Sequence, residues 1–355
     1  MTAPLTLEAA LNRGRHNNLD LLRLIAAMAV VVSHAWPLAL GRGATEPLQG
    51  ALGISLGGVA VLLFFFLSGM LVTASAERNR ISKGRFVMAR VMRIFPGLSV
   101  ALVVTVLLAL ASGATANLSE AVIYILRGLS LVSLQHELSD AFAANPYAGA
   151  VNGPLWTLFY EVGCYALIAA AVWCGLLRQA FGWSIVVATA LGLWVVFELT
   201  GWHGGSSIVY RLSVMAPVLL AFITGAVFWK LRIHLVLRWW AGILFVSVAA
   251  IFAGHALFLP IFTIALGYTA CLLAFRLPVF SLKGDISYGV YVYGWPVAQA
   301  VVALLAPSSP ITLAVLSCLA VLPFAIASWI WVEKPALSLL RRARLAGTSP
   351  RLAVQ

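Results

Sequence analysis

Charged side chains are scarce in this chain. Only 10% of its 355 residues are Asp, Glu, Lys or Arg, whereas 62% are hydrophobic, and the mean hydropathy is +1.00. A typical soluble domain carries about 25% charged residues. The composition therefore excludes an ordinary soluble domain and predicts an all-α, polytopic integral membrane protein.

Cysteine is also scarce, with four residues in all. Cys164, Cys174, Cys271 and Cys318 each lie in an apolar run, and no two of them have the spacing of a paired motif. We interpret them as small buried hydrophobic residues. They give no reason to expect a disulfide framework, and we expect no metal cofactor.

Acidic residues number 11 against 23 lysines and arginines, which gives a net charge of +12. Apolar runs predict about ten membrane spans, at 19–40, 51–75, 91–112, 155–177, 182–200, 210–229, 237–254, 256–275, 286–306 and 311–332. Nearly all cations fall in loops on one side of these spans. The exceptions are Arg23, inside a span, and Arg42, Arg127 and Arg211 on the opposite side.

By the positive-inside rule, this asymmetry predicts that both termini are cytoplasmic. Topology and contact with anionic lipid headgroups explain the basic charge without a nucleic-acid partner. No domain boundary is visible, so we expect one membrane domain over 1–355, with an N-terminal segment 1–18, a bundle 19–332 and a cytoplasmic tail 333–355. The apolar stretch Ala121–Gln135 is too short to span and predicts an interfacial or re-entrant helix.

The first span contains two ionisable residues, Arg23 and His34. Each costs about 3 kcal/mol in hydrocarbon on insertion scales, so such residues are functional candidates. Eleven helical positions complete about three turns, so both side chains share one face, about 16 Å apart along the axis. The alternative is structural, with Arg23 snorkelling to the interface and His34 bonded to a backbone carbonyl.

Arg90 and Arg93 lie where the third span meets a cation-rich loop. They are three residues apart and therefore neighbours on one helix face. Guanidinium groups bind phosphate bidentately, so this pair predicts a site for a phosphorylated ligand. The alternative is an ordinary positive-inside anchor.

Glu161 lies about two turns inside the fourth span and shares a face with Trp156 or Thr157 and with Tyr165. A carboxylate at that depth needs a partner, and we expect His34 or Arg23 to supply it. Elsewhere, Ser68 in the second span and Tyr288 and Tyr291 in the ninth could line a cavity. Close helix packing and an interfacial aromatic belt are their structural alternatives.

Taken in order, these elements resemble the membrane acyltransferase family 3 proteins, which acylate sugars and other acceptors at bacterial membranes. The resemblance covers nearly the whole chain. One departure is Gly294, where family members often have a histidine. The motifs that carry the resemblance are Arg23 with His34, Phe65–Gly69, Arg90 with Arg93 before Pro96, Leu155–Leu158 with Glu161 and Tyr165, Ser287 and Tyr288 with Tyr291 and Pro296, and Glu333 with Pro335.

The resemblance implies an O-acyltransferase of the bacterial inner membrane that moves an acyl group from cytosolic acyl-CoA, most simply acetyl-CoA, to a glycan hydroxyl. His34 would be the base or would carry the acyl group covalently. Arg23 would stabilise the developing oxyanion or position the donor, and Glu161 would be the third catalytic residue. The implied donor-binding residues are Arg90, Arg93, Ser68, Tyr288 and Tyr291, and the implied acceptor-binding residues are Trp156 and Tyr165. The rival hypothesis is a proton-coupled transporter or flippase that uses Arg23, His34 and Glu161.

Overall fold

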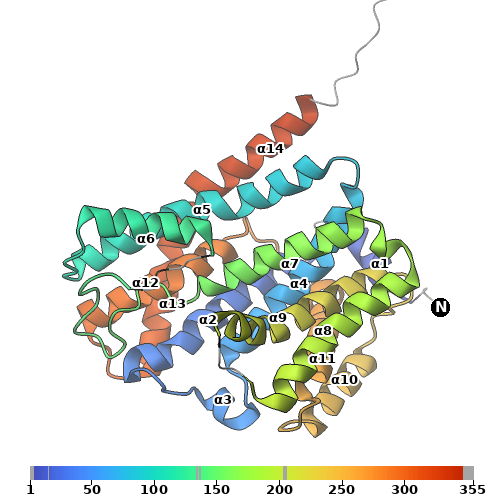
Figure 1. Cartoon of the computed structure of the whole chain (residues 1–355), viewed down its shortest axis with the longest axis horizontal. Coiled ribbons are helices and arrows are strands. Elements are labelled where there is room, and N and C mark those ends of the chain that lie inside the picture. Colours follow the sequence, from blue (N-terminus) through green and yellow to red (C-terminus); the bar gives the residue numbers. More distant parts are fainter. Residues whose placement is uncertain (1–3, 15, 133–134, 136, 203–205, 347–355) are drawn as a thin grey trace, which may run out of the picture.

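The computed structural model describes residues 4–14, 16–132, 135, 137–202 and 206–346, with side chains as far as residue 340. These residues form helices and loops, with only two isolated β-bridges among them, Thr6 to Val236 and Glu137 to Ala150. The prediction of an all-α polytopic membrane protein is confirmed (Figure 1).

Nine helices of the described residues are long and apolar enough to cross a membrane. Seven of them match predicted spans to within about five residues at each end. The eighth begins at Lys83, eight residues before the predicted span 91–112, so part of the predicted cation-rich loop is helical. The ninth is the apolar segment Pro310–Leu340, which contains α13 (Pro310–Ser328). The other eight are α2 (Leu19–Leu40), α4 (Leu56–Arg78), α5 (Lys83–Ala111), α7 (Trp156–Trp173), α8 (Ala180–Thr200), α9 (Ser207–Lys230), α11 (Phe258–Arg276) and α12 (Ser287–Leu305). Short helices also lie outside these spans, among them α1 (Leu7–Leu11), α3 (Pro47–Leu52) and a 3-10 turn at Leu176–Arg178.

The helix found at the predicted seventh span, 237–254, is too short to cross a membrane. Its helix α10 (Trp239–Ile251) has 13 residues, which is about 20 Å of helix against a hydrocarbon core of about 30 Å. The helix ends in a turn in which Gly254 has φ +81°. The hydropathy of 237–254 cannot show where this turn begins, so the sequence overestimates the helix length.

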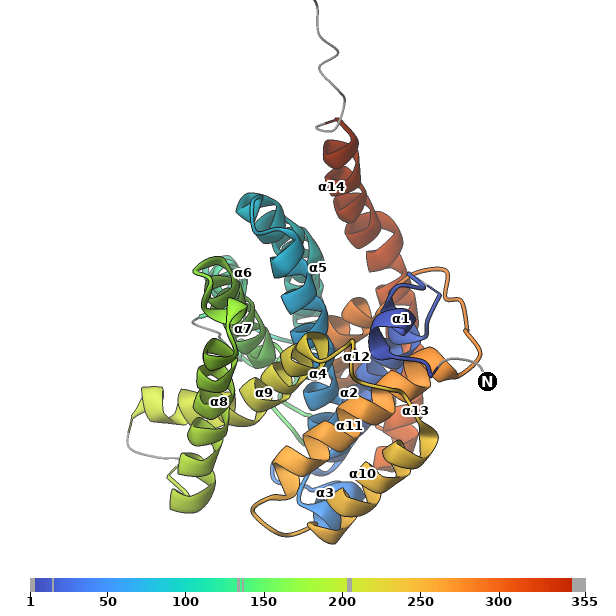
Figure 2. The same ribbon diagram turned by 90° about the vertical axis from the view of Figure 1, so that its right-hand side faces the viewer.

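The C-terminal segment also differs from the expected tail. After α13, the chain continues through a π-helical turn, Trp329–Glu333, directly into α14 (Lys334–Ala346). This helix packs along α5 and projects from the rest of the bundle (Figures 1 and 2). The first part of the predicted tail is therefore helical, and residues 347–355 lie outside the described residues.

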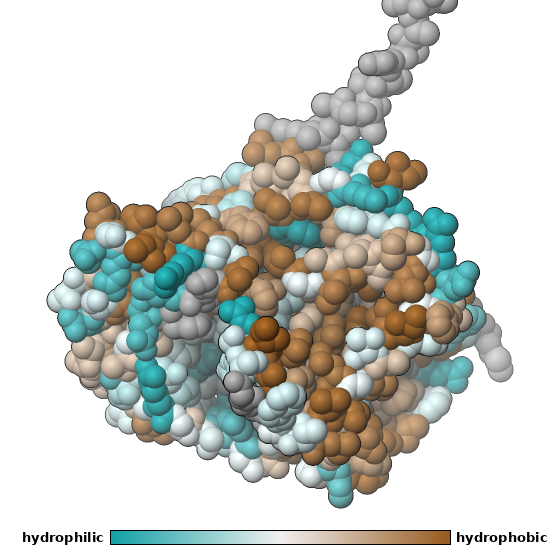
Figure 3. All heavy atoms as spheres, viewed as in Figure 1, coloured by the Kyte–Doolittle hydropathy of each residue, from teal (hydrophilic) through white to brown (hydrophobic). Residues whose placement is uncertain are grey.

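The surface is strongly apolar. Leu107, Ile243 and Leu319 are each more than half exposed, and hydrophobic side chains cover much of the face seen in Figure 3. A large exposed apolar surface on a polytopic chain is the surface that lipid covers. The predicted interfacial stretch is α6 (Leu118–Ser130), which packs on α5 and exposes Leu118 and Leu126.

The closest helix packing is between α4 and α9, where two glycines let the backbones meet. A Cβ at Gly69 would lie 1.8 Å from the carbonyl oxygen of Phe222, and one at Gly225 would lie 2.0 Å from that of Phe66. Small residues permit such approaches between membrane helices. This contact fixes α4, which carries Ser68, against the core.

Helix α2 runs through the middle of the bundle and packs against α4, α12 and α13 (Figure 2). This position places Arg23 and His34 inside the protein instead of in lipid. At Gly294 of α12, an added Cβ would lie 2.7 Å from Cγ2 of Val31. The glycine that departs from the family pattern therefore allows α12 to approach α2, and a histidine would not fit there without a shift.

Candidate active site

Two cavities lie along α2. The larger one, which we call the histidine cavity, has a volume of about 480 Å³ and includes His34, Ser33, Glu46, Gln49 and Trp156 in its lining. The smaller one, which we call the arginine cavity, has a volume of about 110 Å³. Its polar lining consists of Arg23, Ser68, Arg90, Arg93, Thr157, Glu161, Tyr165, Ser287, Tyr288 and Tyr291.

His34 packs edge-to-face on Trp295 of α12, with ring centroids 4.9 Å apart and an interplanar angle of 76°. Trp295 is itself fixed, because its indole N–H donates to the carbonyl oxygen of Ala150 at 2.9 Å. Among the described residues, none makes a hydrogen bond to the imidazole. The ring is therefore held by packing, and both of its nitrogens are available to a ligand in the histidine cavity.

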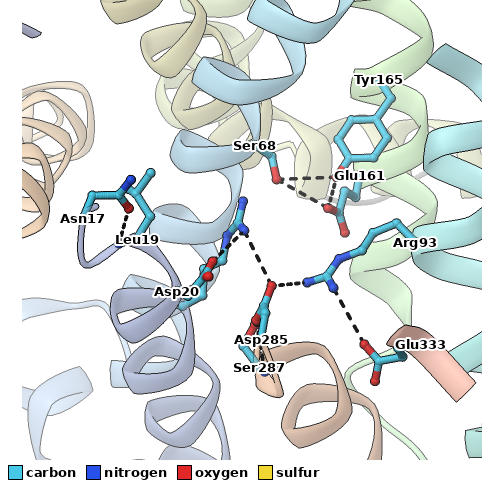
Figure 4. Close-up of polar contacts among 11 residues, drawn as sticks. Asn17, Leu19, Asp20, Ser68, Arg93, Glu161, Tyr165, Asp285, Ser287 and Glu333 are labelled. Atoms are coloured by element: carbon cyan, nitrogen blue, oxygen red, sulfur yellow. Dashed lines mark hydrogen bonds and ion pairs between the residues drawn. The ribbon is translucent and has the colours of Figure 1, made fainter. Parts of the chain in front are cut away.

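Arg93 belongs to a buried ion-pair network. Its guanidinium lies 2.6 Å from Asp285 and 3.7 Å from Glu333, while Arg23 lies 3.6 Å from the same oxygen of Asp285. Figure 4 shows Asp285 and Glu333 on opposite sides of the Arg93 guanidinium. The side chains of Asp285 and Glu333 are only 11% and 2% exposed, so each buried charge in the network depends on a partner.

Asp285 lies just before α12 and joins the network to the start of that helix. It accepts hydrogen bonds from the hydroxyl and the backbone N–H of Ser287. Burial alone would raise its pKa, but Arg93, Arg23 and these hydrogen bonds outweigh burial and hold the pKa of Asp285 below its ordinary value. Asp285 is therefore ionised at neutral pH and bridges α2 to α5.

Arg90 differs from Arg93 in having no ion-pair partner among the described residues. Its guanidinium lies 5.3 Å from the ring centroid of Phe86 and 5.4 Å from that of Tyr165. Its Nε is buried without a hydrogen-bond partner. Such a donor is costly unless something binds it. The two arginines that the sequence treats as one pair thus have separate surroundings, and Arg90 is the one left free to bind an anion.

The expected pairing of Glu161 with Arg23 or His34 is wrong. Glu161 instead accepts hydrogen bonds from the hydroxyls of Tyr165 and Ser68, the latter at 3.4 Å, and the three side chains form one group in Figure 4. Arg23 is paired instead with Asp20, one turn earlier in the same helix, and with Asp285, just before α12. The sequence could not show the second pair, because it joins segments far apart in the chain.

The remaining candidates divide between the two cavities. Ser68 and Tyr288 line the arginine cavity, and the hydroxyl of Tyr288 donates to the carbonyl oxygen of Ile94 at 2.8 Å. Trp156 lines the histidine cavity, whereas Tyr165, which the sequence groups with it, lies in the arginine cavity. Tyr291 borders both.

Sequence reasoning missed two carboxylates of this region as site residues. Asp285 precedes a predicted span and reads as an ordinary helix-start residue. Glu46 lies in a loop, yet it is 5% exposed, lines the histidine cavity and accepts a hydrogen bond from the backbone N–H of Leu56. Acidic residues are few in this chain, and this scarcity is the sequence signal that could have identified both carboxylates as candidates.

The fold and the two cavities define a class: a multi-pass membrane protein with a buried polar site reached along one central helix. The sequence model of the acyltransferase domain family, type 3, matches residues 16–330, and the chain belongs to that family. The resemblance seen in the sequence is thereby confirmed, and the chain is an acyltransferase. Family membership decides against the transporter hypothesis.

Three relatives show how far the similarity extends. Nodulation protein 10 of Rhizobium leguminosarum bv. viciae is 30% identical, over 92% of this chain and 94% of its own length. An O-acetyl transferase of Shigella phage Sf6 is 27% identical, over 90% and 96%. The exopolysaccharide production protein ExoZ of Rhizobium meliloti (strain 1021) is 28% identical, over 84% and 94%. No solved structure matches the chain.

The part of the chain that the structure describes contains no group of three or more His, Cys, Asp or Glu side chains placed to hold a metal ion.

Proposed function

We propose that this acyltransferase moves an acyl group, most simply acetyl, from cytosolic acyl-CoA to a hydroxyl of a cell-surface or lipid-linked glycan in a bacterial inner membrane. The names of the relatives support the acetyl group and a polysaccharide acceptor, since one is an O-acetyl transferase and another an exopolysaccharide production protein. The observation that carries the proposal is the pairing of two adjoining cavities, one with a histidine free to bind substrate and one with an unpartnered guanidinium.

In this reaction the acceptor oxygen forms a bond to the thioester carbonyl carbon, and the bond between that carbon and the sulfur of coenzyme A breaks. The acceptor loses its hydroxyl proton to His34, which then protonates the departing thiolate. The products are an ester and free coenzyme A, and the histidine returns to its neutral form. A hydroxyl is a poor nucleophile, so a positioned base is the main requirement of this step.

Two features support His34 as that base. It lines the larger cavity with both ring nitrogens free of hydrogen bonds from the described residues, and edge-to-face packing on Trp295 holds its ring in place. Arg23, about 16 Å away along the helix, is too far to contact the same atoms. Its proposed role is to hold the donor in the arginine cavity.

The donor is proposed to enter the arginine cavity, where Arg90 supplies the free guanidinium for a phosphate. Arg93 is committed to Asp285 and Glu333, so its proposed role is to shape this cavity. Ser68, Tyr165 and Glu161 line the same cavity. The positive-inside pattern supports cytosolic access to this cavity, because both arginines adjoin the cation-rich loop.

The acceptor is proposed to bind in the histidine cavity. Its volume of about 480 Å³ falls within the range of small-molecule sites, about 300–1,000 Å³. Trp156 offers a broad apolar face, while Glu46 and Gln49 offer the hydrogen-bonding groups that sugar hydroxyls require. An apolar wall with a few polar groups suits a sugar ring better than an ion or a lipid chain.

The test is complementation of a strain that lacks the gene. We expect wild-type protein to restore an acyl mass on the surface glycan, and His34→Ala to restore none at equal membrane abundance, because it lacks the base. His255→Ala is the matched control, since His255 is exposed and lies outside both cavities. Near-normal acylation with His34→Ala would refute the catalytic role, and an unchanged glycan in the deletion strain would refute the glycan acceptor.

A further inference from the structure

The two cavities meet at a single place. Of the described residues, only Val61 of α4, Thr157 of α7 and Tyr291 of α12 line both of them. We call this group the throat. If the donor occupies the arginine cavity and the acceptor the histidine cavity, the thioester carbonyl can meet the acceptor hydroxyl only at the throat.

Two sides of the throat are fixed by hydrogen bonds. The hydroxyls of Thr157 and Tyr291 lie 2.5 Å apart, and both also lie within hydrogen-bond distance of the carbonyl oxygen of Pro154, at 3.2 and 3.0 Å. One hydroxyl can therefore donate to the other, which in turn donates to the carbonyl oxygen, so all three groups are satisfied within the wall. The ring of Tyr291 is further held edge-to-face by Phe64, with centroids 5.8 Å apart. Neither hydroxyl needs a substrate, so together they form a rigid wall.

The third side, Val61, is apolar and lies on a continuous face of α4. Gly57, one turn before it, lines the histidine cavity, and Phe65 and Ser68, one and two turns after it, line the arginine cavity. Gly57 adds no side chain to this face and Phe65 is buried in the core. The isopropyl group of Val61 is therefore the part of this wall that limits the width of the throat.

The arginine cavity beyond the throat is small. Its volume is about 110 Å³, against about 480 Å³ for the histidine cavity. Because protein interiors are close-packed, an additional methylene group in such a space must displace a wall. Two of the three walls are cross-linked by hydrogen bonds, so they resist displacement.

We propose that the throat formed by Val61, Thr157 and Tyr291 selects the acyl group by length, admitting a two-carbon acyl group and excluding longer ones. This inference rests on the proposed function, because it takes the donor to be an acyl-CoA in the arginine cavity. It assigns specificity to an apolar residue, Val61, that is neither the proposed base nor the proposed phosphate-binding residue. A methylene group in a fitted apolar pocket changes specificity by about 10- to 200-fold.

The experiment uses inverted membrane vesicles that contain the full-length protein and the endogenous acceptor. They receive equimolar acetyl-CoA and propionyl-CoA, and the ratio of the two acyl masses on the glycan gives the ratio of the two kcat/KM values. Val61→Ala removes two methyl groups from the throat, and we expect it to raise the propionyl share by about 10-fold or more. Val59→Ala makes the same change two residues away, outside both cavities, and is expected to leave the ratio unchanged.

A second variant protects the test against misfolding. Thr157→Ser removes one methyl group from the opposite wall but keeps the hydroxyl that bonds to Tyr291, so it should shift the ratio in the same direction by a smaller factor. If folded Val61→Ala and Thr157→Ser both keep the wild-type ratio, the throat does not select the acyl group, and the proposed function still stands. If wild-type vesicles transfer no acyl group from either acyl-CoA, the proposed function and the throat are refuted together.

Discussion

Replacing Asp285 by asparagine is expected to destabilise the protein through the charges that it leaves behind. Asparagine has nearly the same shape and still accepts a hydrogen bond from Ser287, so the change removes mainly the negative charge. That charge lies 2.6 Å from Arg93 and 3.6 Å from Arg23, on a side chain that is 11% exposed. The variant therefore isolates the contribution of the ion pairs.

The magnitude follows from the remaining partners. Removing one member of a buried ion pair costs about 3–5 kcal/mol, because the other charge stays buried without compensation. Here Arg93 keeps Glu333 at 3.7 Å and Arg23 keeps Asp20 at 3.7 Å. We therefore expect a loss at the lower end, about 3 kcal/mol in the free energy of unfolding.

Asp20→Asn is the matched control, because Asp20 is the second carboxylate beside Arg23. Its side chain is 58% exposed, and an exposed ion pair contributes about 0–1 kcal/mol. The assay is unfolding by dodecyl sulfate in mixed micelles, followed by the fluorescence of the 12 tryptophans. If Asp285→Asn loses no more stability than Asp20→Asn at pH 7, the buried network does not support the fold as described.

The same comparison has a defined pH dependence. The folded pKa of Asp285 is below its ordinary value, so its contribution is fully present above the unfolded pKa of about 3.9. It is lost only as the pH falls through the lower, folded pKa. The contribution of the Asp285 charge should therefore persist from about pH 5 to pH 8. A difference that disappears within that window would contradict the assignment.

Two further predictions concern the arginine cavity and the helix packing. Arg90→Ala should raise the KM for acyl-CoA at least 10-fold with little change in kcat, since one charge-assisted hydrogen bond to phosphate contributes about 1.5–3 kcal/mol. The control is Arg78→Ala, which lies outside both cavities. Equal KM values in the two variants would refute the role of Arg90 in donor binding. Gly69→Ala should lower the unfolding midpoint strongly, because the added Cβ would lie 1.8 Å from a carbonyl oxygen of α9. Gly163→Ala should leave the midpoint nearly unchanged, because nothing lies within 4 Å of a Cβ added there. Equal midpoints for the two variants would contradict the close packing of α4 on α9.

By itself, the sequence determined the class of protein, most of the spans and the identity of the polar residues inside them. Length and hydropathy suffice for this, because a helix in hydrocarbon must satisfy its own backbone and must be apolar over about 20 residues. Ionisable residues are so costly in such segments that Arg23 and His34 stand out without any structure. The same reasoning overestimated the helix at 237–254, since hydropathy does not mark where a turn begins.

The tertiary structure alone decided which of these residues are partners. Arg90 and Arg93 are equivalent in the sequence, yet one is neutralised by Asp285 and Glu333 and the other keeps an unpartnered nitrogen. Glu161 bonds to Ser68 and Tyr165 and not to a cation. Ion pairs and cavities form between helices far apart in the chain, so periodicity within a helix gives the face of a residue but not the neighbour that this face meets.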